Sequence, residues 1–191
     1  WERRARELGL EKLAAGSGET VLEIGFGPGH SLVALARAVG SSGRIFGIDL
    51  SPKMSDLARH RVREAGLAQR VDFRSGDATQ LPFAIGSCDA VFMSFVLELF
   101  DSPEIPQVLG ECRRVLRAGG RICVVSLSME GKPSRMRGLY IWGHERWPAL
   151  LDCRPIFVGR ALQAAGFQLG NNAMASLWGL PVEVALAVKP L

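Results

Sequence analysis

Three acidic residues stand at the ends of apolar runs that have the composition of buried strands. Glu23 ends the first run, Asp49 ends "RIFGID" and Asp77 follows "VDFRSG". In a parallel sheet the carboxyl ends of the strands share one edge, where ligands bind. A carboxylate at Glu23 suits a positively charged amino group, and Asp49 can accept both hydroxyls of a ribose. Asp77 can accept from an exocyclic amine while the Ala78 amide donates to a ring nitrogen, so the three positions together predict an adenosine site.

Each carboxylate also has a structural interpretation. Glu23 could cap a neighbouring loop, Asp49 could cap the helix that follows Ser51, and Asp77 could stabilise a turn. Turn chemistry explains any one of the three, but it explains poorly why all three stand at successive strand ends.

A glycine loop follows the first acidic residue, with Gly25, Gly27 and Gly29 at alternate positions. Gly25 and Gly27 would let the main chain turn tightly and approach a ligand closely. The dinucleotide fingerprint G-x-G-x-x-G places its third glycine three positions after the second. Here the third glycine, Gly29, stands only two positions after the second, Gly27, and His30 occupies the position of the third glycine in the fingerprint. The spacing therefore disfavours a loop that binds pyrophosphate.

The apolar residues alternate between the periods expected for strands and helices. The expected strands are 20–24, 44–50, 71–77, 88–95 and 121–127, and the expected helices are 32–39, 52–65, 102–116 and 155–165, with a turn at 118–120. Segments 167–178 and 182–188 are separated only by "GLP", too short for a crossover helix, so they are expected to pair as an antiparallel hairpin. We therefore expect an α/β fold in a single domain, residues 1–191. Its sheet is doubly wound, mostly parallel and seven-stranded, with helices on both faces and a C-terminal hairpin.

Composition excludes several classes of protein. The 191 residues are 48% hydrophobic, enough to bury a core without disulfides or a metal. The longest apolar stretch, 90–100, is shorter than the roughly 20 residues of a membrane span. The net charge of +4 comes from arginines scattered among acidic residues, which disfavours nucleic-acid binding. Four isolated cysteines disfavour a metal site and favour a reducing, cytoplasmic setting. Because the chain begins at Trp1, we expect residues to be missing before it.

Five motifs occur in order along the chain: "LEIGFGPG" at 22–29, "GIDLSPKM" at 47–54, "GDATQLPF" at 76–83, "CDAVFMSFVL" at 88–97 and "LRAGGRICV" at 116–124. Together they resemble the class I S-adenosylmethionine-dependent methyltransferases. The resemblance implies a Rossmann-like fold that binds S-adenosylmethionine and releases S-adenosylhomocysteine. It also implies that the glycine loop surrounds the methionine part, that Asp49 binds the ribose, and that Ser94 and Phe95 lie near the sulfonium. The cofactor-binding residues expected on these grounds are Glu23, Gly25, Phe26, Gly27, Gly29, Asp49, Leu50, Met54, Gly76, Asp77, Ala78, Ser94 and Phe95.

Methyl transfer from a sulfonium is an in-line displacement that depends on positioning and needs no metal. A phenolic or ring-carbon acceptor would benefit from a general base. Tyr140 and His144 lie four residues apart and would share one face of a helix, with His144 as base and Tyr140 as orienting donor. Glu98 is a third candidate. Packing or surface exposure is the alternative for His144, and the first turn of a short helix is the alternative for Glu98.

Segment 128–155 is expected to form a substrate lid. Its Trp142 and Trp147, beside basic residues, could form an apolar pocket or a peripheral membrane contact for a lipophilic substrate. The motifs "LPF", "LRAGGR" and "CRPIFVGRALQAAGF" look most similar to the ubiquinone/menaquinone biosynthesis C-methyltransferase group. The expected function is thus methylation of a small molecule, such as a quinol-like or phenolic ring. An NAD-binding oxidoreductase and an S-adenosylmethionine-binding module without turnover are the alternatives.

Overall fold

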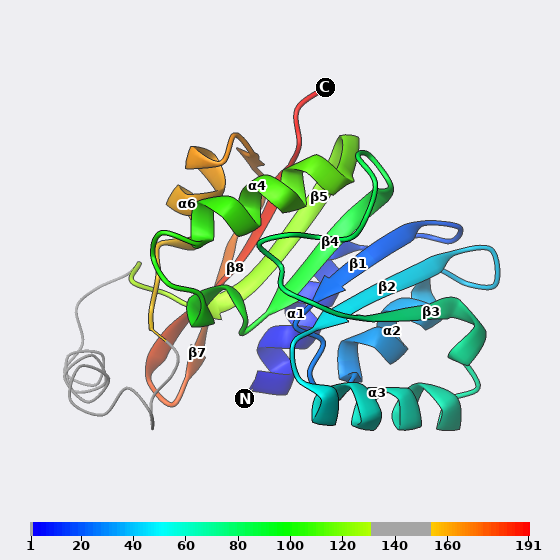
Figure 1. The fold of residues 1–191 in the computed structure, drawn as a ribbon. Coiled ribbons are helices and arrows are strands. Elements are labelled where there is room, and N and C mark those ends of the chain that lie inside the picture. The colour runs from blue at the N-terminus through cyan, green and yellow to red at the C-terminus, as the bar shows by residue number, and fades with distance from the viewer. Residues whose placement is uncertain (1, 131–153) are drawn as a thin grey trace.

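The computed structural model describes residues 2–130 and 154–191. These residues form an eight-stranded sheet with helices on both faces (Figure 1). The strand order is β3-β2-β1-β4-β5-β8-β6, and β7 also pairs with β8. Strands β1 to β5 are parallel to one another, whereas β8 runs antiparallel to β5, β6 and β7. Strand order reverses between β1 and β4, which is where sheets of this kind bind ligands.

The boundaries of the elements are as follows. The strands are β1 (Thr20–Ile24), β2 (Arg44–Asp49), β3 (Val71–Ser75), β4 (Cys88–Ser94), β5 (Leu116–Leu127), β6 (Gln168–Leu169), β7 (Ala173–Leu177) and β8 (Leu180–Val188). The helices are α1 (Glu2–Leu13), α2 (His30–Ala38), α3 (Pro52–Glu64), α4 (Ile105–Val115) and α6 (Val158–Ala164), with short 3₁₀ helices η1 (Ala68–Arg70) and η2 (Leu97–Leu99).

The two faces of the sheet carry separate apolar layers because successive side chains of a strand point to opposite faces. Val21 and Phe92 lie in the layer covered by α1, α2 and α3. Leu22 and Val91, their chain neighbours, lie in the layer covered by α4 and α6. Burial on both faces explains why the central strands read as continuous apolar runs.

The predicted fold class is confirmed, with eight strands in place of seven in the described ranges. Segment 167–178, predicted as one strand, divides into β6 and β7. Between them the Leu186 amide donates to the Asn172 side chain at 3.2 Å instead of to a strand carbonyl. The predicted antiparallel hairpin is confirmed, with Ala173 opposite Val184.

Two helices begin later than predicted. Helix α4 begins at Ile105 rather than at Ser102. Helix α6 begins at Val158 rather than at Pro155, because the chain just before it first forms a bridge to the end of β5. The turn predicted at 118–120 lies inside β5, where the pairing with β4 shifts register.

Helix α1 lies outside the predicted elements. Its buried positions Ala5, Gly9 and Leu13 repeat every four residues and pack on the sheet. A Cβ at Gly9 would lie 2.4 Å from the Val125 Cγ2 atom, so glycine is what permits this close approach. Within the described ranges, every helix is too short or too polar to span a membrane.

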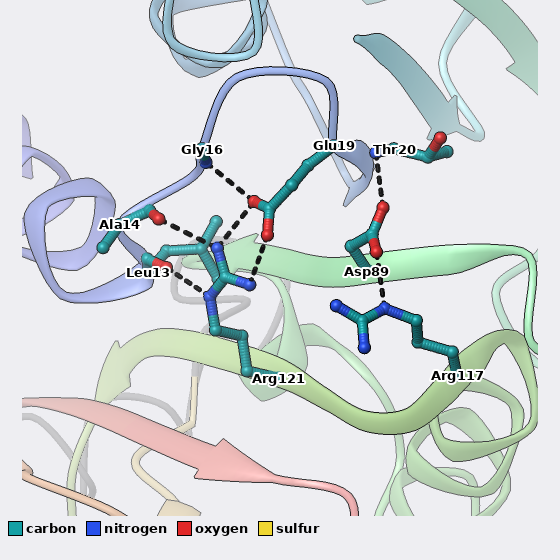
Figure 2. A network of polar contacts seen from close by, with 8 residues as sticks. All are labelled: Leu13, Ala14, Gly16, Glu19, Thr20, Asp89, Arg117 and Arg121. Carbon is teal, nitrogen blue, oxygen red and sulfur yellow. Dashed lines mark hydrogen bonds and ion pairs between the residues drawn. The ribbon is translucent and has the colours of Figure 1, made fainter.

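A polar network at the amino edge of the sheet fixes the C-terminal end of α1 (Figure 2). Arg121 Nε donates to the Leu13 carbonyl at 2.6 Å, and its Nη2 donates to the Ala14 carbonyl at 2.9 Å. The same Nη2 lies 2.7 Å from a Glu19 carboxylate oxygen, which also accepts from the Gly16 amide at 2.7 Å. One arginine therefore joins β5, the end of α1 and the loop before β1.

Candidate cofactor and active site

The glycine loop after β1 is fastened to the end of β2. The Gly25 amide donates to the Ile48 carbonyl, and the Gly27 amide donates to Asp49 Oδ2, each at 2.8 Å. Asp49 Oδ1 accepts from the Ser51 amide, also at 2.8 Å. Asp49 thus holds the loop and the start of α3 together at the carboxyl edge of the sheet.

Two glycines of the loop adopt left-handed backbone conformations for different reasons. Gly25 has φ 65°, and a Cβ there would lie 2.3 Å from Val96 Cγ2. Gly27 has φ 49°, and a Cβ there would have no atom within 4 Å. The first glycine permits tight packing against the segment after β4, and the second leaves main chain facing open space.

A cavity of about 530 Å³ opens beside this loop. Ten residues expected at the cofactor site line it: Gly25, Gly27, Asp49, Leu50, Met54, Gly76, Asp77, Ala78, Ser94 and Phe95. Its other lining residues are Ile24, Ile48, Val96, Leu99, Phe100 and Glu104. The structure therefore brings the ends of β1, β2, β3 and β4 together around one cavity.

Four of the additional lining residues, Val96, Leu99, Phe100 and Glu104, were missed by sequence reasoning. They follow β4 directly, in the apolar stretch "FVLELFDSPE". Their signal was available, because residues just after a central strand of a parallel sheet lie at its ligand-binding edge.

The end of β4 is held in a strained backbone conformation. Phe95 has φ 56°, in the left-handed region that non-glycine residues rarely adopt. Its amide donates to the Val125 carbonyl at 2.7 Å. Strain of this kind costs on the order of 1–3 kcal/mol and is common at ligand sites. Here it turns the chain from β4 into η2 at the wall of the cavity.

Asp77 takes part in a turn as well as in the cavity wall. Its Oδ1 accepts from the Thr79 amide at 2.8 Å, so the structural interpretation holds for one of its oxygens. Ala78 beside it is buried. Both interpretations of Asp77 are compatible, because a carboxylate has about four acceptor positions.

Glu23 does not line the cavity. Its side chain is only 2% exposed, on the face of the sheet covered by α1 and α2. It bonds to the Ser31 side chain, while its Oε2 has no hydrogen-bond partner in the described chain. Burial raises the pKa of Glu23 to about 8. The carboxyl group is therefore close to the loop but covered in this structure.

Two other expected residues also lie outside the cavity. Phe26 is buried and packs edge-to-face against Phe73, with ring centroids 5.6 Å apart. A Cβ at Gly29 would lie 2.9 Å from Ala58, so this glycine allows α2 and α3 to approach. These two positions support the loop from behind.

Of the three candidate catalytic residues, the structure describes Glu98. Its side chain is 1% exposed, and Oε1 accepts from the Leu127 amide at 3.1 Å. Its Oε2 has no hydrogen-bond partner in residues 2–130 and 154–191. Burial raises the pKa of Glu98 to about 7. His144 and Tyr140 lie outside the described residues.

The cavity fits a cofactor that carries an adenosine. Its volume lies within the range of about 300–1,000 Å³ typical of small-molecule sites, and the open space beyond Gly27 can admit a ligand against main chain. Asp49 accepts one amide on each oxygen, so each oxygen keeps a lone pair for a hydroxyl. The unpartnered Oε2 of Glu23 lies behind the same loop.

Comparisons with known proteins identify the family of the chain. Residues 21–120 match the family model described as a methyltransferase domain. The chain is 35% identical over 124 residues to the demethylmenaquinone methyltransferase of Lactobacillus johnsonii, covering 65% of this chain and 50% of that protein. It is 33% identical over 133 residues to the 2-phytyl-1,4-naphtoquinone methyltransferase of Synechococcus elongatus, covering 70% and 54%. The chain thus spans about half the length of these curated relatives.

Solved structures share the fold. The geranyl diphosphate C-methyltransferase from Streptomyces coelicolor superposes with a TM-score of 0.79 at 18% identity, covering 98% of this chain and 80% of that chain. The [4+2]-cyclase SpnF also superposes with a TM-score of 0.79, at 22% identity, covering 100% and 82%. The predicted Rossmann-like architecture is therefore confirmed, and the oxidoreductase alternative is not favoured.

Proposed function

The chain belongs to the methyltransferase domain family, and on that premise we propose that it transfers a methyl group from S-adenosylmethionine to a small molecule. One observation carries the proposal furthest. A single cavity joins the glycine loop to Asp49 and Asp77, each at the end of a neighbouring strand. This is the arrangement that an adenosine ligand requires.

Residues of this chain would hold the cofactor as follows. Asp49 would accept from the ribose hydroxyls through the lone pairs that its two amide bonds leave free. Asp77 and Ala78 would bind the adenine edge, with Leu50 and Met54 on its faces. Bound S-adenosylmethionine supplies an electrophilic methyl group on its sulfonium. The methionine part of the cofactor would lie along the cavity wall formed by Gly25, Gly27, Ser94 and Phe95.

For the acceptor, we propose a phenolic or quinol-like ring. Support comes from the names of relatives that methylate demethylmenaquinone and a phytyl naphthoquinone. The cavity wall after β4 is apolar at Val96, Leu99 and Phe100, which suits such a ring.

A general base would remove the acceptor's proton. Glu98 is the candidate within the described residues, because it follows β4 between the cavity residues Val96 and Leu99 and burial raises its pKa to about 7, although its own side chain does not line the cavity. His144 and Tyr140 remain the proposed alternatives.

Other features of the proposal concern the whole chain. Residues 1–191 would form one domain, with 128–155 as the substrate lid. The protein would act in the cytoplasm, with peripheral membrane contact for a lipophilic acceptor and no part in nucleic-acid binding.

The test is a methyl-transfer assay with labelled S-adenosylmethionine against quinols, phenols and amines. We expect transfer to a quinol or phenol, and at least a tenfold loss of cofactor affinity in Asp49→Ala. Asp56→Ala, at an exposed position of α3, is the matched control and should change nothing. Calorimetry with NAD and S-adenosylhomocysteine separates the alternatives. Preferential NAD binding would contradict the cofactor, and cofactor binding without transfer to any acceptor would favour a module without turnover.

A further inference from the structure

A loop without helix or strand, residues 76–87, connects β3 to β4 and begins at the cavity. Its first residues, Gly76, Asp77 and Ala78, are part of the cavity lining. Within the described residues, the main chain of 81–83 makes no hydrogen bond to another main-chain group. Main-chain polar groups in the protein interior nevertheless need partners. Side chains must therefore supply the partners of this part of the loop.

Helix α4 supplies them through one ion pair. Arg114 Nη2 donates to the Leu81 carbonyl at 2.9 Å, and its Nη1 donates to the Phe83 carbonyl at 2.7 Å. The Leu81 amide donates to Glu111 Oε2 at 2.7 Å. The two side chains also bind each other, with 2.6 Å between Arg114 Nε and Glu111 Oε1. We call this pair and its three bonds to the loop the Glu111–Arg114 clamp.

A third side chain of α4 extends the contact toward the cavity. Gln107 Nε2 donates to the Thr79 carbonyl at 3.4 Å, directly after the cavity residue Ala78. Gln107, Glu111 and Arg114 are spaced by four and three residues, so they share one face of α4. Their partners follow in the same order at alternate positions of the loop. The helix and the loop therefore run side by side away from the cavity.

Both ends of the cavity-lining part of the loop are thus fixed. On the far side of the clamp, the Leu81 and Phe83 side chains are 5% and 9% exposed, and the Phe83 ring stacks on Phe46 with centroids 4.8 Å apart. On the near side, the Gly76 amide donates to the Asp49 carbonyl at 3.4 Å. The residues that face a ligand lie between these two points.

The chemistry of the clamp suits this task. A planar guanidinium presents several donors in a fixed fork, so one arginine can bind two carbonyls and a carboxylate together. The hydrogen bond from Arg114 lowers the pKa of Glu111, which keeps the carboxylate ionised. Hydrogen bonds to ionised groups are shorter and stronger than those between neutral groups. A lysine has a single ammonium and could not span the same partners.

We propose that the Glu111–Arg114 clamp of α4 positions Asp77 and Ala78 so that they can recognise the base of the cofactor. Glu111 and Arg114 are positioning residues, because they act through the loop and bind neither cofactor nor acceptor. This inference rests on the proposed function, in which Asp77 accepts from the exocyclic amine and the Ala78 amide donates to a ring nitrogen. It predicts that loss of the clamp lowers selectivity for adenine, beyond any loss of stability.

The experiment is calorimetry with S-adenosylhomocysteine and S-inosylhomocysteine, in which hypoxanthine replaces adenine. Hypoxanthine carries an acceptor in place of the amine and a donor in place of the ring acceptor, so it can make neither contact. The wild-type chain should therefore prefer S-adenosylhomocysteine at least about tenfold.

Arg114→Met, which removes the donors but keeps an apolar stem, should weaken S-adenosylhomocysteine binding about tenfold. It should change S-inosylhomocysteine affinity less than about threefold, because that ligand makes no bond to lose. Arg114→Lys should restore part of the preference. Arg113→Met is the matched control, since Arg113 is the neighbouring arginine on the exposed side of α4, and it should leave both affinities unchanged.

Glu111→Gln tests the clamp in a second way if Arg114→Met does not fold. The amide oxygen of glutamine can still accept from the Leu81 amide, but the ion pair with Arg114 is lost. We expect a preference between those of the wild type and Arg114→Met, and an unchanged preference would overturn the proposal.

The remaining outcomes separate the proposal from the function on which it rests. Equal weakening of both ligands in Arg114→Met would show that the clamp only shapes the cavity, and the proposal would be wrong. Unchanged affinity for S-adenosylhomocysteine in that variant would also overturn it, as would a wild-type chain that binds both ligands equally. A wild-type chain that binds neither ligand would contradict the proposed function itself.

Discussion

The two edges of the sheet treat charged groups in opposite ways. At the amino edge, Arg121 bonds Glu19 and the carbonyls of Leu13 and Ala14 at the end of α1, and a second ion pair lies beside them (Figure 2). At the carboxyl edge, Glu23 and Glu98 are almost fully buried, and each keeps one oxygen without a hydrogen-bond partner in the described chain. One edge pairs its charges, and the other leaves carboxyl oxygens unsatisfied.

We infer from this difference that the amino edge contributes mainly to the stability of the fold and the carboxyl edge mainly to ligand binding. A buried polar atom without a partner costs on the order of 1–3 kcal/mol, and the left-handed Phe95 adds strain at the same edge. Proteins retain unsatisfied or strained groups of this kind mainly where the groups take part in ligand binding or in a reaction. The amino edge also holds a left-handed residue, Ala14 at φ 49°, but its charged groups are paired and tie α1, β1 and β5 together. Substitutions at the two edges should therefore have different signatures.

The largest effect is expected at the glycine loop. Gly25→Ala introduces a Cβ 2.3 Å from Val96 in a left-handed conformation, so the loop must move. Calorimetry should show S-adenosylmethionine affinity reduced at least 100-fold. The control is Gly66→Ala, at φ 72° with no atom near its Cβ. It should cost about 1 kcal/mol of stability and leave affinity unchanged, so a similar affinity loss in both variants would contradict the explanation.

The next effect belongs to the amino edge. Arg121→Ala removes four hydrogen bonds and leaves Glu19 without its partner, so the free energy of unfolding in urea should fall by about 2–3 kcal/mol. Cofactor affinity should change less than twofold. Arg117→Ala, at the more exposed ion pair, should cost less than about 1 kcal/mol. A large affinity loss in Arg121→Ala would show that the two edges are coupled.

A smaller effect concerns pH. Burial raises the pKa of Glu98 from 4.5 to about 7, so between these values the folded protein keeps a proton that the unfolded chain has lost. The free energy of unfolding should fall as pH rises through this window, with a contribution from Glu98 of at most about 1.4 kcal/mol per pH unit. Glu98→Gln should reduce that slope. The exposed Glu64→Gln should keep it, and an unchanged slope in Glu98→Gln would rule out this origin.

The smallest effect is expected at the cap of α3. The Ser51 hydroxyl accepts from the Met54 amide at 3.3 Å, so Ser51→Ala should cost about 1 kcal/mol. This corresponds to a melting temperature lower by about 2–4 °C. Because Met54 lines the cavity, cofactor affinity should fall two- to threefold. Ser51→Asp, which keeps an acceptor, should restore both values if the cap is the cause.

Sequence predicted the fold where local pattern and global topology agree. The strand Thr20–Ile24, for example, is an apolar run that is followed by a glycine. Asp49 and Asp77 stand at the ends of strands, and parallel pairing brings those ends to one edge of the sheet, where the cavity lies. Helix α1 was not predicted, because its buried face consists of Ala5, Gly9 and Leu13. Two of these residues are too small to produce a clear apolar pattern. Its contribution depends on how closely it approaches the sheet.

The direction of individual side chains was the part that sequence could not provide. Glu23 and Phe26 were expected at the ligand, yet both are buried behind the loop. Glu23 lies inside β1, where alternation puts its side chain on the face of Val21, and that face is covered by α1, a helix that the sequence pattern did not predict. The direction of Phe26 depends on the left-handed Gly25 before it, and conformations of this kind leave little trace in hydrophobic period.

The two amide bonds of Asp49 have a thermodynamic consequence. A free aspartate side chain would lose rotational freedom on ordering, at a cost of order 0.5–1.5 kcal/mol for an immobilised side chain. The Gly27 and Ser51 amides fix the Asp49 carboxylate from both sides. A ribose diol would therefore bind to a carboxylate that is already ordered. The loss of side-chain entropy is part of folding and does not reduce the free energy of binding.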